Sequence, residues 1–447
     1  MRSRKNSKTT GRIVSVAFIL TCTLSSLAII PNPNVSIGRP TYSNVKNPSD
    51  ATDGKSKTIC MSHSSDSVPF YIAINLGEIT ATRVLLKWDA SGWSYWVTGA
   101  VPADYTIDLS DNSTDGVDGD WTTVVTVADN PVKSRSHSFD LDGNTWVRMS
   151  ITADYGTTTT RIAAVDIYDI SDGCEDYWVF LGNSITCEVF NTIDTGKAFM
   201  DLIAKVRPEY TPCGIPASKG GFTSQDIRDN LGQIMKMNPD AKYYALSIGT
   251  NDGNLDKFEA NIQAIIDTIK NAGAVPVLAR TCATRGGKKL EYAEKCDELT
   301  TANDLVPGPD LFTLFNEHSP DYFRDELHPS PAGVTAFHQA WADAAVAAGL
   351  YSGQTALVTP EITGHNTILL QNRGLDFTAQ TDDNIVLNVF NLNGRLVYSH
   401  TKKVAAGQKV SFDFMPESGV LSSGAYLLRV NGAGSEFTSR IVTKGIR

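Results

Sequence analysis

The sequence lacks the motifs expected of a metal centre or of a nucleic-acid-binding surface. It contains no C-x-x-C pair and no H-E-x-x-H helix, so a zinc site has no support, and we expect neither a metal nor a cofactor. The net charge is −10, from 39 basic and 49 acidic residues, and no basic block follows the N-terminus, which argues against nucleic acid as a partner. Small neutral molecules and polymers are left as possible substrates.

Long apolar runs are also scarce, and the strongest one lies at the N-terminus. Five basic residues between Arg2 and Arg12 precede the apolar run from Ile13 to Leu20, so we interpret residues 1–30 as a secretory signal peptide. A membrane anchor would need about 20 continuous apolar residues, and threonine and serine interrupt this run from position 21. We therefore expect an exported protein.

Export permits disulfide bonds. Six cysteines would follow the leader, and six thiols allow fifteen pairings, among which the sequence does not choose. Among local pairs, a disulfide between Cys282 and Cys296 would be the easiest to form.

Residues 41–172 are rich in short strand-like runs separated by turns, which predicts a β-sandwich. The order of Ala51-Thr52-Asp53-Gly54, the strand-like run from Tyr71 to Gly77 and the later strand at Trp146 resembles discoidin-like galactose-binding modules. Such modules often bind glycans. The resemblance implies stacking residues on one loop, with packing inside the sandwich as the alternative. The candidates are Trp93, Tyr95 and Trp96.

Residues 174–351 alternate strand-like and helical stretches, which predicts an α/β domain whose parallel sheet is covered by helices on both faces. In such sheets, sites form at the carboxyl ends of the strands. Ser184 and Asn251 each lie just past the end of an expected strand. The expected helices are Ala198–Val206, Thr223–Met237, Leu255–Ala272 and Pro331–Ala348.

Helical periodicity ends near residue 351, and we expect a linker over residues 352–370 and a small β-sandwich over residues 371–447. The segments Val389–Val397 and Leu421–Val430 resemble C-terminal sorting domains of cargo for the type IX secretion system. The resemblance implies the secretion machinery as a partner and a secreted or cell-surface location. Another accessory β-module is the alternative.

Five residues of the α/β region could together perform acyl transfer, which requires a nucleophile, a base, a carboxylate that orients the base, and donors for the oxyanion. Ser184 follows an apolar strand, although Gly-Asn-Ser could be only a turn. His328 precedes a helix with clear start signals, and Asp325 lies three residues earlier. Gly221 and Asn251 could supply oxyanion donors.

Four segments occur in the order shown by the SGNH/GDSL hydrolase family. They are Gly182-Asn183-Ser184, Gly221, Gly249-Thr250-Asn251-Asp252 and Asp325-Glu326-Leu327-His328-Pro329. The resemblance implies a three-layer flavodoxin-like fold, catalytic Ser184, Asp325 and His328, and an oxyanion hole made by Ser184, Gly221 and Asn251. Asn183 occupies the position where many members of the family have aspartate. In the second block, the adjacent Gly220 is an alternative to Gly221. The chain has no G-x-S-x-G elbow, which argues against the α/β-hydrolase class.

Taken together, the resemblances imply a secreted serine esterase that acts on an acylated carbohydrate, such as acetylated xylan. The inference about the substrate is based on the neighbouring domains and not on the chemistry of a pocket. A lipase or broad acylhydrolase is the alternative within enzymes. A glycan-binding surface protein without catalytic activity is the alternative outside them.

Overall fold

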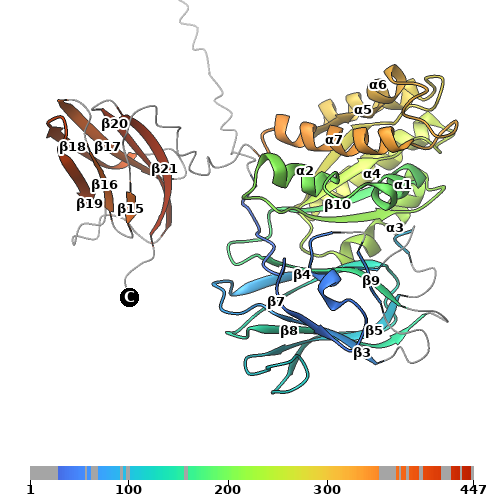
Figure 1. Cartoon of the computed structure of the whole chain (residues 1–447). Helices are drawn as coiled ribbons and strands as arrows, with labels where there is room; N and C mark the ends of the chain where they lie inside the picture. The colour runs from blue at the N-terminus through green and yellow to red at the C-terminus, as the bar shows by residue number, and fades with distance from the viewer. Residues whose placement is uncertain are drawn as a thin grey trace, which may run out of the picture.

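The computed structural model describes residues 29–55, 58–61, 69–90, 94–96, 101–155, 160–351, 369–371, 374–378, 382–391, 396–413, 424–432 and 435–443. Every helix in these ranges is too short or too polar to cross a membrane. The described residues form an N-terminal β-sandwich, an α/β domain and a C-terminal β-unit (Figure 1), which confirms the predicted fold class.

The sandwich consists of two antiparallel sheets with a short 3-10 helix, η1 (Pro48–Ala51), beside them. Large apolar side chains fill its centre, and Trp88 donates a hydrogen bond to the Tyr105 hydroxyl at 3.1 Å. One sheet has the order β1 (Thr41–Ser43), β3 (Phe70–Asn75), β8 (Trp146–Asp154), β5 (Pro102–Ser110), β6 (Thr122–Val127). The other has the order β2 (Cys60–Met61), β9 (Arg161–Asp169), β4 (Arg83–Ala90), β7 (Ser134–Asp140).

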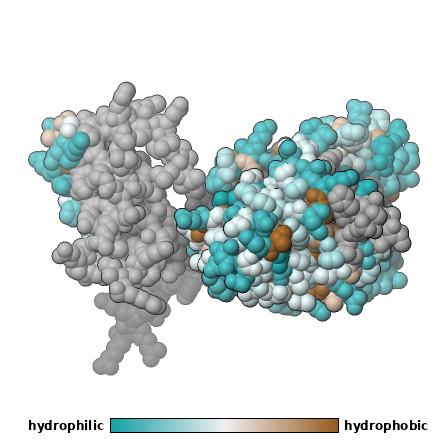
Figure 2. All heavy atoms as spheres, turned by 60° about the horizontal axis from the view of Figure 1, so that its bottom comes forward, coloured by the Kyte–Doolittle hydropathy of each residue, from teal (hydrophilic) through white to brown (hydrophobic). Residues whose placement is uncertain are grey.

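The face of the sandwich turned to the viewer in Figure 2 carries mainly hydrophilic and intermediate residues. Figure 2 shows this side of the molecule with hydrophobic residues as separate spots. Its exposed large apolar residues are Ile37, Val117, Val124 and Tyr155. Scattered apolar residues of this kind are normal on a folded surface and do not indicate a docking face.

The α/β domain has a five-stranded sheet in which all strands are parallel. Its order is β11 (Cys213–Ser218), β10 (Tyr177–Gly182), β12 (Tyr243–Ser247), β13 (Val275–Arg280), β14 (Val306–Asp310). The helices are α1 (Ser184–Thr192), α2 (Phe199–Val206), α3 (Ser224–Met237), α4 (Leu255–Asn271), α5 (Leu290–Ala302), α6 (Leu311–Glu317) and α7 (Pro331–Ala347). The four helices expected from the sequence are α2, α3, α4 and α7.

Side chains alternate between the two faces along the strands, and both faces are buried because helices cover each of them. On β10, Trp178 and Phe180 pack with α1, α2, α6 and α7, whereas Tyr177, Val179 and Leu181 pack with α3, α4 and α5 on the opposite face. The sheet therefore holds the end of β10 rigidly between two layers of helices. Its carboxyl edge is the place where β10 passes into α1 (Figure 1).

The segment that precedes the sandwich also belongs to the fold. Ile29 is 1% exposed in the core of the α/β domain, and its N–H donates to the Leu350 carbonyl at 2.9 Å. The Asn32 amide donates to the carbonyls of Asp169 and Gly173 at 3.0 and 2.7 Å. Residues 1–28 of the expected leader lie outside the described residues. A leader that extended to residue 30 would remove the core residue Ile29.

The six cysteines after the leader are all free thiols. Cys282 lies in the core beneath α1, α2 and α7, whereas Cys296 lies in the core on the other face of the sheet. The Cys296 sulfur lies 3.7 Å from the Thr281 hydroxyl. The local pairing suggested by sequence spacing is therefore wrong, because the sheet separates the two side chains.

The C-terminal unit consists of two antiparallel sheets. One contains β15 (Leu369–Gln371), β16 (Gly374–Thr378) and β19 (Lys409–Asp413). The other has the order β18 (Leu396–Val404), β17 (Asp383–Asn391), β20 (Gly424–Gly432), β21 (Ser435–Thr443). Most of the expected linker, residues 352–368, lies outside the described residues.

Candidate active site

Ser184 is the first residue of α1, directly after β10. Asn183 caps the helix, because its side-chain oxygen accepts the Ile185 N–H at 2.9 Å. Asn183 thus performs the capping that aspartate would also perform, which accounts for its place in the motif. Gly182 is required here, since a Cβ would lie 2.0 Å from the Thr186 hydroxyl. The N–H of Ser184 belongs to the helix N-terminus, where backbone donors lack partners within the helix.

The loop before α7 places an imidazole on this serine. His328 Nε2 lies 3.0 Å from Ser184 Oγ. On the other side of the ring, Nδ1 lies 3.0 and 3.2 Å from the two Asp325 carboxylate oxygens. The loop is closed by a hydrogen bond from the Arg324 N–H to the His328 carbonyl at 2.9 Å. The serine, histidine and aspartate predicted from the sequence therefore form a continuous hydrogen-bonded chain.

Asp325 is held in its charged form. Its carboxylate accepts the backbone N–H groups of His328 at 2.7 Å and Leu327 at 2.8 Å. These bonds, first the one from His328, hold the pKa of Asp325 well below its usual range. A carboxylate fixed in this way orients Nδ1 of the imidazole as a donor and leaves Nε2 as the acceptor for the serine proton.

The two other predicted blocks lie beside each other. The Asn251 side chain donates to the Phe222 carbonyl at 2.9 Å, so it reaches the loop that contains Gly221. Gly221 has a φ of +81°, with open space where a Cβ would lie, and the Gly220 Cβ position is 4.0 Å from the Ser184 Cβ. Gly220 is thus close to Ser184, and Gly221 follows it in the same loop. Gly221 has the left-handed backbone that favours glycine.

Asp252 joins the third block to α3, a contact that the sequence did not reveal. This residue is 6% exposed, and its carboxylate accepts the Ser224 N–H at 3.1 and 3.2 Å as well as the Ser224 hydroxyl. The buried bonds fix the loop after β12 relative to the loop that carries Gly221. Asn251 is therefore positioned from both sides.

An ion pair between α1 and the loop of His328 was also not predicted from the sequence. Glu188 lies one turn after Ser184 on α1 with 4% of its side chain exposed, and its Oε1 accepts Arg324 Nη1 at 2.7 Å. Arg324 Nη2 lies 3.7 Å from the Asp325 carboxylate. The guanidinium thus links the helix of the serine to the loop of the histidine. An acidic residue at a buried position of α1 was the available signal.

We expect Arg324→Met to lower kcat about tenfold with little change in KM, because a shift of about 1 Å in a catalytic group can cost up to about a hundredfold. Loss of Arg324 also leaves the Glu188 carboxylate buried without its partner. Steady-state kinetics with a chromogenic acetate ester would measure the change.

A matched control is Arg285→Met. Arg285 pairs with Glu326 on the same loop at 3.7 Å, but both side chains are exposed, so we expect an effect below twofold. A double-mutant cycle with Glu188→Gln should be non-additive. Additive losses would show that the pair does not act as a unit.

Tyr95 does not lie on an exposed sugar-binding loop. It is 3% exposed, its N–H donates to the Ser218 carbonyl at 3.0 Å, and its hydroxyl accepts the Asn238 amide at 2.9 Å. Tyr95 packs between the sandwich and the α/β domain, so its prediction as an exposed stacking residue is wrong. The alternative, packing inside the sandwich, does not describe Tyr95 either, because its core neighbours include residues of the α/β domain.

Trp96 also contacts the α/β domain. Its ring lies 5.0 Å from that of Phe222, between centroids, and its Nε1 donates to Gln233 at 3.2 Å. Trp93, the third candidate, lies outside the described residues. The described part of this loop therefore joins two domains.

Two segments match family models. Residues 180–336 match the GDSL-like Lipase/Acylhydrolase family, and residues 373–444 match the Secretion system C-terminal sorting domain. A comparison with curated proteins gives no match.

Several solved structures are similar to parts of the chain. A variant of Axe2, an acetyl xylan esterase from Geobacillus stearothermophilus, is 17% identical, with 40% of this chain and 96% of that chain covered and a TM-score of 0.34. Chitosan-binding module 1 from the chitosanase/glucanase of Paenibacillus sp. IK-5 is 23% identical, with 30% and 98% covered and a TM-score of 0.25. Protein YXIM of Bacillus subtilis is 15% identical, with 69% and 91% covered and a TM-score of 0.38.

Proposed function

Since residues 180–336 form a GDSL-like lipase/acylhydrolase domain and a C-terminal sorting domain follows it, we propose that the protein is an exported serine esterase. The observation that carries this proposal is the hydrogen-bonded chain from Ser184 through His328 to Asp325. We also propose that residues before Ile29 are removed as a signal peptide.

In the proposed mechanism, His328 Nε2 takes the proton of Ser184 as Oγ attacks the ester carbonyl. The charge that develops on the carbonyl oxygen is stabilised by the N–H groups of Ser184 and Gly221 and by the Asn251 amide. Collapse of the tetrahedral intermediate expels the alcohol, which takes its proton from His328. Water then attacks the acyl-enzyme by the same steps and releases the acid. Asp325 stabilises the imidazolium throughout.

We propose an acetylated carbohydrate as the substrate. The neighbouring domains support this proposal. The N-terminal β-sandwich resembles glycan-binding modules, and the C-terminal sorting domain indicates export to the surface or the medium. A broad acylhydrolase that acts on lipid esters is the second candidate, because the family description includes lipases.

The substrate proposal is tested by measuring kcat/KM for p-nitrophenyl esters of two to twelve carbons and acetate release from acetylated xylan. We expect the acetate ester to be the best of the series and acetate to be released from the polymer. A maximum at eight or more carbons would instead support the lipid-ester candidate. Absence of hydrolysis of every ester would support a glycan-binding protein without catalytic activity.

We expect Asn251→Ala to lower kcat by about a hundred- to a thousandfold, as is typical when one oxyanion donor is lost. The kinetic measurement uses p-nitrophenyl acetate. Asn230→Ala is the matched control, because its amide also donates to a backbone carbonyl, that of Asp226 at 2.8 Å, but on α3. A loss below threefold in Asn251→Ala would remove this side chain from the oxyanion hole.

A further inference from the structure

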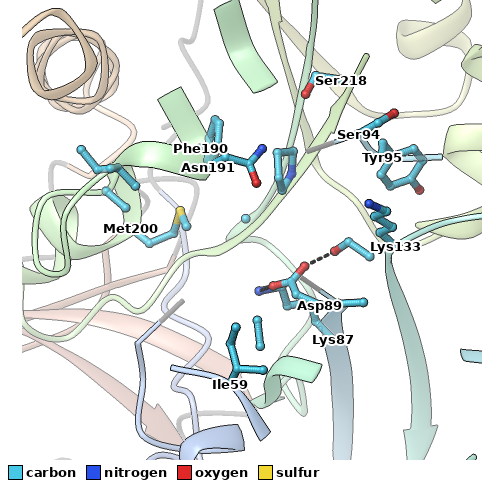
Figure 3. Close-up of a pocket in the computed structure, with 17 residues that line it drawn as sticks. Ile59, Lys87, Asp89, Ser94, Tyr95, Lys133, Phe190, Asn191, Met200 and Ser218 are labelled. Carbon is cyan, nitrogen blue, oxygen red and sulfur yellow. Dashed lines mark hydrogen bonds and ion pairs between the residues drawn. The ribbon is translucent and has the colours of Figure 1, made fainter. Parts of the chain in front are cut away.

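A cavity of about 320 Å³ lies where the sandwich meets the α/β domain (Figure 3). Strands β4 and β7 form one wall, and β11 with the C-terminal end of α1 and the start of α2 forms the other. The residues that line it include none of Ser184, Asp325 and His328. The cavity is therefore separate from the candidate active site, although Ser218 and Phe190 of its wall lie on the elements that lead to that site.

One charged side chain of this cavity, that of Lys133, has no partner within the part of the chain that the structure describes. Lys133 is 8% exposed, and its ammonium makes no hydrogen bond or ion pair with any described residue. The nearby Lys87 differs, because it forms ion pairs with Asp89 and, at 3.3 Å, with Asp166. Asp89 is further engaged by the Ser134 hydroxyl. Figure 3 shows Lys133 among these cavity-lining side chains.

A buried ammonium without a counter-ion is costly, since charged groups inside proteins are normally paired or hydrogen-bonded. Burial lowers the pKa of Lys133, which reflects the same cost. An anion bound in the cavity would remove this cost. The Ser94 hydroxyl oxygen is also buried on the same wall, without a hydrogen-bond partner among the residues described, and it can donate or accept a hydrogen bond.

The size and the remaining walls restrict the anion further. A volume of 320 Å³ is at the lower end of the range of about 300–1,000 Å³ for small-molecule sites. An inorganic ion or acetate would leave most of it empty. Figure 3 shows Phe190 and Met200 across the cavity from Lys133, with the Asn191 side chain beside Phe190, so an occupant should have both an anionic end and a face of C–H groups.

We propose that this cavity binds a sugar acid of one or two rings, with the carboxylate on Lys133. The ring hydroxyls then meet Ser94 and the Asp89 carboxylate, and the C–H face of the ring lies on Phe190 and Met200. The site is distinct from the catalytic one and does not depend on the proposed esterase activity.

The test is isothermal titration of the full-length secreted protein with glucuronate and galacturonate, beside glucose as the neutral control and acetate as the bare carboxylate. We expect one site per chain for a sugar acid, at least tenfold weaker binding of glucose and acetate, and unchanged binding by Ser184→Ala. Lys133→Met should weaken binding about ten- to a hundredfold, the range for loss of a charge-assisted hydrogen bond.

Lys236→Met is the matched control, because Lys236 is exposed on α3, away from the cavity. If Lys133→Met does not fold, thermal unfolding of the wild-type protein still tests the proposal. A sugar acid should raise its Tm, and glucose at the same concentration should not. Equal binding by wild type and Lys133→Met, equal binding of glucose, binding lost in Ser184→Ala, or no binding of either sugar acid would each overturn the proposal.

Discussion

Ser184→Ala is expected to lower kcat for p-nitrophenyl acetate by about six orders of magnitude, the loss typical when the nucleophile of a serine hydrolase is removed. The reason is that no acyl-enzyme can form, although the oxyanion donors and the binding surface are intact. A residual rate of about a thousand- to ten-thousandfold over water is expected from those donors alone. Active-site titration with an organophosphate should label wild type at Ser184 and leave the variant unlabelled.

Ser218→Ala is the control for this variant. Ser218 lies at the carboxyl end of the neighbouring strand β11, is 2% exposed and accepts a hydrogen bond from the Cys187 thiol at 3.3 Å. It has no place in the proposed mechanism, so we expect its activity within threefold of wild type. Equal hydrolysis by wild type and Ser184→Ala would remove Ser184 as the nucleophile.

Asp325→Asn is expected to lower kcat about ten-thousandfold with the fold intact, as for the equivalent change in other serine hydrolases. An asparagine at this position can donate to Nδ1 and so favours the tautomer in which Nε2 carries the proton, which cannot accept the proton of Ser184. Asp321→Asn, on the same loop and exposed, is the matched control. A loss below tenfold in Asp325→Asn would show that the carboxylate is not needed to orient the imidazole.

The pH dependence of the wild-type enzyme follows from the same contacts. The backbone N–H of His328 holds the pKa of Asp325 below its usual range, so Asp325 stays charged, and continues to orient the imidazole, at pH values where an ordinary aspartate would be protonated. We therefore expect no second acidic step in log(kcat/KM) from protonation of Asp325, so that the acidic limb has a slope of one and not of two. A slope of two would show that Asp325 titrates in the same range.

Strong local signals were enough to predict several elements of the fold from the sequence. Ser330 and Pro331 are the start signals that identified α7, because Ser330 satisfies an N–H group at the start of the helix. The order of the four motif segments also identified Ser184, Asp325 and His328 as candidates. The parallel direction of the strands then follows from the alternation of strands and helices.

Two strands that lack a local signal, β11 and β7, were not predicted from the sequence. Strand β11 contains glycine and proline in Cys-Gly-Ile-Pro-Ala-Ser, and its pairing with β10 is set by the sheet and not by its own propensity. Strand β7 has mostly polar residues, and it forms because β4 pairs with it. Formation of these strands depends on pairing with strands distant in the sequence, and a local sequence pattern contains no information about such partners.

Contacts between side chains of different elements could not be predicted and became known from the three-dimensional fold. Cys282 and Cys296 are close in sequence, yet the sheet lies between them. Glu188 and Arg324 are 136 residues apart, yet they form an ion pair between α1 and the loop of His328. Tyr95, which the sequence placed on a binding loop, is buried at the domain contact, where the cavity with Lys133 also lies. Burial and pairing of this kind arise from packing of whole elements, and no residue pattern within one element specifies them.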